Sequence, residues 1–252
     1  MKTYRLIQLS FMIALGSIFT LSSCLDSFGD EYPPRPCRTC PTDNIDSLVF
    51  KSNERPLART YTEWINEWLK TFPYDICEAT GTIHDGIFTV LDRSERVYFL
   101  AGATGITSIR NIDLESGKPI LFPVVNVVKT YPCLVQPGKA PAKEQTLEDF
   151  LRQETAASMN FTSQIKVSLD GLPYQLTAYH RIITPVFKTY KDRTLGSCFD
   201  ACIASDRPQD AISDGYWIML KGLEAGDHVL TFKGGIPKDG IDNEATYHIT
   251  VR

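Results

Sequence analysis

The sequence has little positive charge with which to bind a polyanion. Its 252 residues include 26 Lys and Arg against 30 Asp and Glu, which gives a formal net charge of −4. No stretch combines clustered basic residues with interleaved aromatics, so nucleic acid is not an expected partner. Hydrophobic residues make up 43% and charged residues 22% of the chain, as in an ordinary globular domain.

The sequence also lacks the short motifs of the common enzyme classes. It has no nucleophile elbow, P-loop, dinucleotide fingerprint, H-E-x-x-H helix or EF-hand loop. We therefore assign no catalytic residue, cofactor or metal, and a hydrolase of unknown type is only a second alternative. Histidine is scarce, with four residues. A metal pair of His228 and His248 would need adjacent strands in register, and the alternation around His248 favours an exposed side chain.

No apolar run is long and continuous enough for a stable transmembrane helix. The best one, 6–21, is interrupted by polar residues and glycine, whereas a span needs about 20 predominantly apolar residues. Lys2 and Arg5 precede it, as in a secretory signal. The run ends at Leu21-Ser22-Ser23-Cys24, which resembles a bacterial lipobox and predicts a diacylglycerol on the Cys24 thiol. Residues 1–23 are then a removed signal peptide; the alternative is an ordinary cleaved signal with an incidental cysteine.

A lipid on Cys24 would place the mature protein at the cell envelope. Several acyl chains, each contributing about 0.8 kcal/mol per buried methylene, make such an anchor effectively permanent. Leu25, rather than an aspartate, follows Cys24 and favours the outer membrane, on its periplasmic side or at the cell surface. The expected partners are the membrane, through Cys24, and an envelope glycan, peptide or protein.

Six further cysteines are candidates for disulfides. An even number in an exported chain favours bridges, up to three, and fifteen connectivities are possible. Cys37 and Cys40 have the C-x-x-C spacing of redox and zinc sites, but prolines surround them instead of a strand and a helix. Structural bridges are favoured over zinc because thiols outside the cytoplasm are usually oxidised. The six are Cys37, Cys40, Cys77, Cys133, Cys198 and Cys202.

The sequence pattern predicts one domain after a tether. Residues 24–58 are acidic and proline-rich with little periodicity, which is typical of a linker, and residues 59–252 form the expected domain. Apolar stripes over 60–72 and 146–159 predict two amphipathic helices, each opened by a capping box. Short segments rich in β-branched and aromatic residues predict strands at 86–92, 96–102, 118–128, 164–169, 174–179, 215–221, 227–232 and 246–251.

Many short strands with few helices indicate a mainly β fold. We expect an antiparallel β-sandwich, of the jelly-roll or immunoglobulin-like kind, with one or two added helices. Asp170-Gly171 lies between two predicted strands and predicts a tight hairpin turn.

Asp214, Tyr216 and Trp217 are the candidate ligand-binding residues. A carboxylate beside two aromatic rings is suited to binding a sugar. The alternative interpretation is a turn at the entry to a strand, with Trp217 in the core. The favoured function is a non-catalytic glycan- or peptide-binding module, and an accessory subunit of an outer-membrane protein complex is the first alternative.

Several segments, taken in order, resemble a family of exported bacterial proteins. They are "YTEWINEW", "VYFLAG", "GKPILFPVVN", "DGYWIMLKGLEAGDHVLTFKGG" and "TYHITV", spread from about residue 60 to 252. Leu69 stands where the family commonly has a third aromatic residue. The family carries no assigned activity, so the resemblance implies one exported domain and nothing catalytic. Family members carry cysteines near Cys77 and Cys133, which implies a bridge between these two and leaves Cys198 with Cys202 and Cys37 with Cys40.

Overall fold

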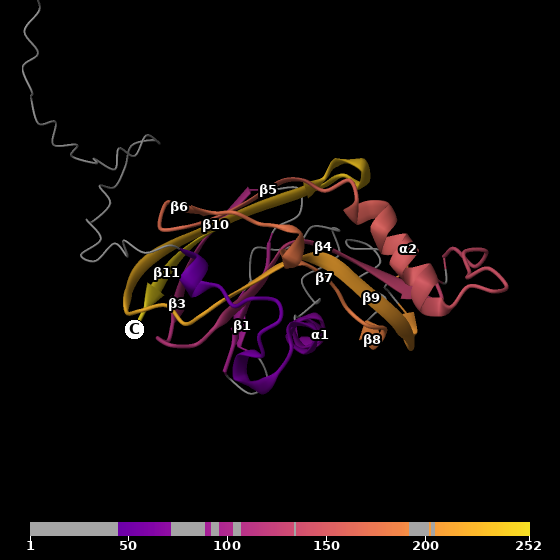
Figure 1. Cartoon of the computed structure of the whole chain (residues 1–252), viewed down its shortest axis with the longest axis horizontal. Helices are drawn as coiled ribbons and strands as arrows, with labels where there is room; N and C mark the ends of the chain where they lie inside the picture. The colour runs from indigo at the N-terminus through magenta and orange to yellow at the C-terminus, as the bar shows by residue number, and fades with distance from the viewer. Residues whose placement is uncertain are drawn as a thin grey trace, which may run out of the picture. The chain divides into compact units, whose positions relative to one another are not determined.

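Two β-sheets packed face to face form the folded domain in the computed structural model (Figure 1). The structure describes residues 45–71, 89–91, 96–102, 107–133, 135–191, 202 and 205–252. The first sheet has, in order, β1 (Thr89–Leu91), β2 (Tyr98–Leu100), β4 (Ile120–Tyr131), β9 (Ser205–Leu220) and β7 (Arg181–Ile183), with β8 (Phe187–Lys191) also paired to β9. The second has, in order, β3 (Thr107–Leu114), β11 (Ile241–Val251), β10 (Gly226–Ile236), β5 (Ser163–Leu169) and β6 (Leu172–Tyr174).

The expected β-sandwich with added helices is confirmed, although both sheets are mixed. β2 runs parallel to β4, and β3 runs parallel to β11, while the other strand pairs are antiparallel. Parallel neighbours require a crossover connection, so these two pairs join strands that are not linked by a hairpin. The predicted hairpin at Asp170-Gly171 is confirmed: both residues have positive φ, 52° and 78°, between β5 and β6.

Large aromatic side chains fill the space between the two sheets. Phe122 of β4 stacks on Phe232 of β10 with ring centroids 4.7 Å apart, and Phe232 lies 6.0 Å from Tyr247 of β11. All three side chains are fully buried. Each aromatic ring of this size buries roughly 150–250 Å², so the stack is a major source of hydrophobic stabilisation.

Helix α1 (Tyr61–Thr71) lies on the side of the six-stranded sheet away from the other sheet (Figure 1). Its capping box is confirmed: the Glu63 backbone N–H donates to Thr60 Oγ1 at 3.2 Å, and the Thr60 N–H donates to Glu63 Oε2 at 2.6 Å. Trp68 packs edge-on against Trp217 of β9, with centroids 5.3 Å apart. The predicted apolar stripe is confirmed by the buried residues Tyr61, Trp64, Ile65, Trp68 and Leu69.

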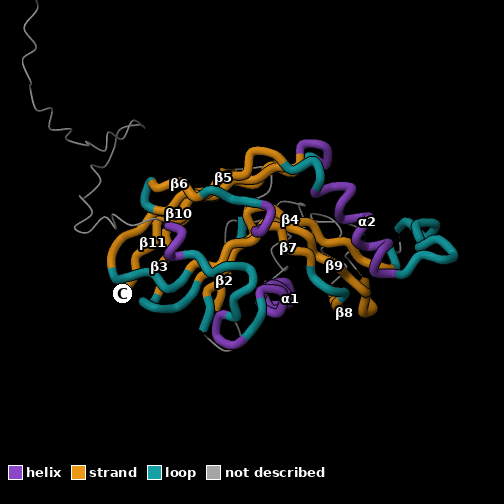
Figure 2. Tube along the Cα trace, viewed as in Figure 1, coloured by secondary structure: helices purple, strands orange, loops and turns teal. Residues whose placement is uncertain are grey.

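Helix α2 (Leu147–Met159) packs against β4 and β9. Thr146 caps it, since its Oγ1 accepts a hydrogen bond from the Asp149 N–H at 3.0 Å. Its apolar face places Leu151 against Ile212 of β9. In Figure 2 α2 lies at the right of the strands, and α1 lies near the bottom of the view, between β2 and β8. No helix in the described part of the chain is long and apolar enough to cross a membrane.

The folded domain begins by residue 45, which corrects the expected boundary at 58/59. Ile45 and Val49 are each only 4% exposed. Val49 forms a β-bridge with Leu220 of β9, and the Tyr61 hydroxyl donates to the carbonyl of Phe50 at 2.7 Å. This burial depends on contacts with distant residues, so the sequence pattern of the segment does not reveal it. The expected signal peptide, Cys24 and the first part of the tether lie outside the described residues.

Candidate functional site

The outward face of the five-stranded sheet carries a groove of about 630 Å³. Leu230 and Phe232 of β10 point into the core, so the residues that alternate with them, Thr231 and Lys233, point outward into the groove. The polar lining comes from β5, β10, β11 and the residue after β6: Gln164, Lys166, Ser168, Gln175, Thr231, Lys233 and Glu244.

A row of hydroxyl groups crosses the strands at the groove. Ser168 of β5 is the register partner of Thr231 of β10, which is in turn the partner of Thr246 of β11. The hydroxyl oxygens of Thr231 and Thr246 lie 3.3 Å apart. Because neighbouring strands are about 4.8 Å apart, the row presents hydroxyl groups at regular intervals on a rigid scaffold.

A second row, of charged groups, runs parallel to the hydroxyl row. Lys166, Lys233 and Glu244 are register partners, two residues further along each strand, or about 6.7 Å. Lys233 Nζ lies 2.8 Å from Glu244 Oε2 and 3.7 Å from Asp242 Oδ1. The hydrogen bond with Glu244 raises the pKa of Lys233 above its usual range, so this side chain is positively charged at neutral pH.

A β-bulge places Gln164 at the groove. The register of β5 against β10 shifts between Lys233 and Gly235, and Gln164 has a φ of 55°. A non-glycine residue in this left-handed region costs on the order of 1–3 kcal/mol, and such strain is concentrated at functional sites. Bulges also redirect side chains and increase local twist. The amide of Gln164 lines the groove as a result.

A hydrogen-bonded pair borders the groove beyond β6. His180 Nδ1 accepts from the backbone N–H of Thr177 at 2.9 Å, so Nε2 carries the hydrogen and donates to Tyr174 Oη at 2.7 Å. Burial lowers the pKa of His180 and raises the pKa of Tyr174. Both groups are therefore neutral at pH 7, and this border of the groove carries no charge from them.

The predicted ligand-binding residues do not form an exposed site. Asp214 and Trp217 are fully buried within β9, and not in a turn at its entry. Arg181 holds Asp214 with an ion pair of 2.7 Å, and Trp68 covers Trp217. Tyr216 is half-buried among core side chains. The interpretation of Trp217 as a core residue is confirmed, because successive residues of β9 around it are buried on both faces of the strand.

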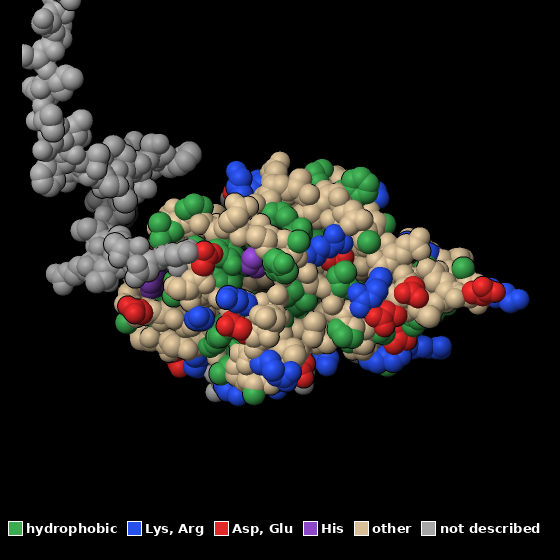
Figure 3. Space-filling model, viewed as in Figure 1, with side chains coloured by type: hydrophobic (Ala, Val, Ile, Leu, Met, Phe, Trp, Pro, Cys, Tyr) green, Lys and Arg blue, Asp and Glu red, His purple; other side chains and the backbone are tan. Residues whose placement is uncertain are grey.

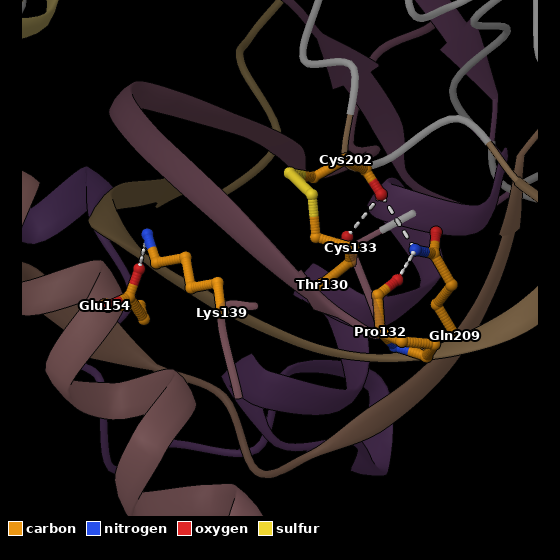
Figure 4. Close-up of a disulfide and its surroundings, with 7 residues drawn as sticks. All are labelled: Thr130, Pro132, Cys133, Lys139, Glu154, Cys202 and Gln209. Atoms are coloured by element: carbon orange, nitrogen blue, oxygen red, sulfur yellow. Dashed lines mark hydrogen bonds and ion pairs between the residues drawn. A yellow bond between two sulfur atoms is a disulfide. The ribbon is translucent and has the colours of Figure 1, made fainter. Parts of the chain in front are cut away.

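Cys133 is bonded to Cys202, which corrects two expected pairings (Figure 4). The bridge joins the end of β4 to the segment before β9, across a sequence separation of 69. The pairings Cys77–Cys133 and Cys198–Cys202 are therefore wrong. The other four disulfide candidates, Cys37, Cys40, Cys77 and Cys198, lie outside the described residues, so a bridge between the first two stays a prediction.

Hydrogen bonds reinforce the disulfide (Figure 4). The carbonyl of Cys202 accepts from Thr130 Oγ1 and from Gln209 Nε2, both at 2.7 Å, and Gln209 also donates to the carbonyl of Pro132 at 2.6 Å. A cavity of about 70 Å³ lies beside the bridge. Ligand pockets usually measure about 300–1,000 Å³, so this cavity is small for a ligand and the groove is the better candidate site.

His228 and His248 do not form a metal pair. Val229 is the register partner of His248, so the two histidines point to opposite faces of the sheet. His248 is exposed, as expected. No group of three or more His, Cys, Asp or Glu side chains that could hold a metal ion is found among the residues that the structure describes.

Sequence reasoning alone does not single out the groove. Its polar residues are Ser, Thr, Gln, Lys and Glu, mostly at alternate strand positions, a pattern that any solvated sheet face shows. The segment "SQIKVSL" carries the alternation, but the rows arise from the register of β5, β10 and β11. That register is a long-range property of the fold.

Comparisons with known proteins do not indicate a function for this chain. No protein-family model matches the chain, and a search of curated proteins found no match. Among solved structures, the chain is similar to one described as "Structure of PbICP-C in complex with falcipain-2", with 10% identity, a TM-score of 0.25, and coverage of 61% of this chain and 98% of that chain. A similarity at that level supports no conclusion about fold, ligand or partner.

Proposed function

We propose that the protein is a lipid-anchored cell-envelope protein whose domain is a non-catalytic glycan-binding module. The observation that carries the proposal is the groove on the five-stranded sheet, with its ordered row of hydroxyl groups. The lipobox-like segment before Cys24 and the resemblance to exported bacterial proteins support the envelope location.

The chemistry of the groove suits a polyhydroxylated ligand. Hydroxyl and amide side chains such as Thr231, Ser168 and Gln164 can both donate and accept hydrogen bonds, as sugar hydroxyls do. They are held on strands, and sites built on strands are positioned more rigidly than sites on loops. The lining also contains apolar and aromatic residues, so a peptide stays the alternative ligand. They are Ile165, Val167, Pro173, Tyr174 and Leu176.

An accessory-subunit role is less well supported. A large apolar patch would favour such a role, whereas the face in Figure 3 shows hydrophobic side chains interspersed with basic and acidic ones. Within the described ranges, the large exposed apolar side chains come from separate elements: Leu57, Ile109, Val135, Phe161, Leu172, Tyr179 and Val229.

A glycan array probed with the full-length protein in detergent tests the proposal. We expect Thr231→Val, which removes one hydroxyl but keeps a β-branched side chain, to weaken binding of a retained glycan about fivefold, the equivalent of about 1 kcal/mol. Thr250→Val on β11 is the matched control, because Thr250 does not line the groove. Absence of any bound glycan, or equal loss in both variants, would reject the groove as the binding site.

The lipid anchor has its own test. Cys24→Ser removes the thiol that would be alkylated, so the variant protein should leave the membrane fraction on carbonate extraction. Membrane association that survives the substitution unchanged would show that the anchor is elsewhere.

A further inference from the structure

Two lysines face each other across neighbouring strands in the groove. Lys166 of β5 and Lys233 of β10 are direct register partners on the outward face. Like charges placed directly opposite each other repel, and acidic residues compensate this repulsion on the Lys233 side only. A ligand that brings a negative charge between them would relieve this repulsion.

The two lysines differ in how they are neutralised. Lys233 is engaged by Glu244 at 2.8 Å and by Asp242 at 3.7 Å, and both acidic residues belong to β11. Lys166 is exposed and forms no ion pair with any residue that the structure describes. The ammonium of Lys166 is therefore the charge that remains available to a ligand in the groove.

We propose that the groove binds an acidic saccharide, with a sugar carboxylate at Lys166 and sugar hydroxyls along the row of Ser168 and Thr231. This inference rests on the proposed glycan-binding function and names the class of glycan. The charged row and the hydroxyl row are about 6.7 Å apart along the strands, so one ligand can reach both. A ligand that does so must carry an anionic group and hydroxyl groups close together, as a uronic or sialic acid does.

Glu244 limits how much negative charge the groove accepts. Its carboxylate lies on the strand next to Lys233, in the same row as Lys166. A second anionic group on the β11 side would meet Glu244 and be repelled, which selects for isolated carboxylates and against densely charged polyanions.

Calorimetric titration of the full-length protein in detergent tests the inference. The probes are methyl galacturonide and 3′-sialyllactose, which carry one carboxylate each, and each is compared with its neutral methyl ester. We expect at least one acid to bind about tenfold more tightly than its ester at low salt, with the difference shrinking as ionic strength rises. Lys166→Gln should remove that preference, so that acid and ester bind equally, while Lys143→Gln, in the loop before α2, should leave the preference intact.

The outcomes separate this inference from the proposed function. Equal binding of acid and ester, with Thr231→Val still weakening both, would overturn the acidic preference and leave glycan binding standing. If tetraglutamate competes for the groove as well as the saccharides do, the groove recognises negative charge alone and the proposed class of saccharide is wrong. If neither saccharide pair binds and the glycan array retains nothing, both proposals fail.

Discussion

Arg181 donates two hydrogen bonds to the buried carboxylate of Asp214, from Nε to Oδ1 at 2.9 Å and from Nη2 to Oδ2 at 2.7 Å. Its Nη1 donates to Asn160 Oδ1 at 2.9 Å, at the end of α2. The side chain of Asp214 is 0% exposed and that of Arg181 is 23% exposed. One arginine thus connects β7, β9 and α2, and the Asp214 charge depends on it.

Arg181→Met should therefore be strongly destabilising. Removal of one partner of a buried ion pair leaves an uncompensated charge and costs about 3–5 kcal/mol in the free energy of unfolding. Urea unfolding followed by circular dichroism measures this loss. Lys188→Met is the matched control, because it removes an exposed partner of Asp210 and should change stability by no more than about 1 kcal/mol. Similar losses in the two variants would contradict the buried role of Arg181.

The disulfide between Cys133 and Cys202 should be detectable and stabilising. A proteolytic digest without reductant should contain a peptide pair linked through these two residues, which mass spectrometry identifies. Closing a loop with a sequence separation of 69 restricts the unfolded chain, so Cys133→Ala with Cys202→Ala should cost about 4 kcal/mol. A digest that links Cys133 to any other cysteine would contradict the fold at the end of β4.

His228 should make stability depend on pH. Its Nδ1 lies 2.8 Å from Asp170 Oδ2 and its Nε2 lies 3.0 Å from the carbonyl of Glu224, so both ring nitrogens face acceptors. The hydrogen bond to Asp170 raises the pKa of His228 above its usual range. The stabilisation from this contact is complete below the pKa of about 6.5 that His228 has in the unfolded chain. It is lost as pH rises through the higher pKa that His228 has in the folded protein.

NMR titration of the imidazole should give a midpoint above the ordinary histidine value. In urea unfolding, the difference in stability between the wild type and His228→Gln should be larger at pH 5.5 than at pH 8.5. His248→Gln, which removes an exposed imidazole, is the control for general effects of the substitution. A stability difference that does not change between the two pH values would contradict the charged contact with Asp170.

Tryptophan fluorescence should indicate a buried environment and should not change when a ligand binds. Trp64, Trp68 and Trp217 are the three tryptophans of the chain, and none is more than 6% exposed. The fluorescence emission of the folded protein should be blue-shifted, and iodide should quench it little. A saccharide that binds the groove should leave the emission unchanged. Quenching by a bound sugar would instead restore the predicted role of Trp217 as a sugar platform.

Both helices could be predicted because their signals are local. Thr60 and Thr146 cap them through residues three positions later, and their apolar stripes repeat at the helical period. Strand β3 shows why other elements could not be predicted. Its inward positions include Ser108 and Arg110, which are buried, so polar residues occupy the face that usually identifies a strand. Arg110 is accommodated through Nη1, which donates to the carbonyl of Ala101 at 2.7 Å.

The candidate site depends on relationships that a local pattern does not contain. Asp214 is neutralised by Arg181, 33 residues earlier, so an acidic residue beside two aromatics is interior instead of exposed. The groove arises only when β5, β10 and β11 are aligned in register. The bond between Cys133 and Cys202 likewise follows from the pairing of β4 with β9.

The position of β11 has a consequence for the order of folding. It lies between β3 and β10 in the five-stranded sheet, yet it is the last strand in the sequence, and β3 precedes it by more than a hundred residues. Such long-range pairing forms slowly, because a long segment must be closed before the contacts are gained. Until β11 pairs with it, β3 has no neighbour on that side of the sheet. The Glu244 side of the groove is therefore complete only when β11 has paired with β10.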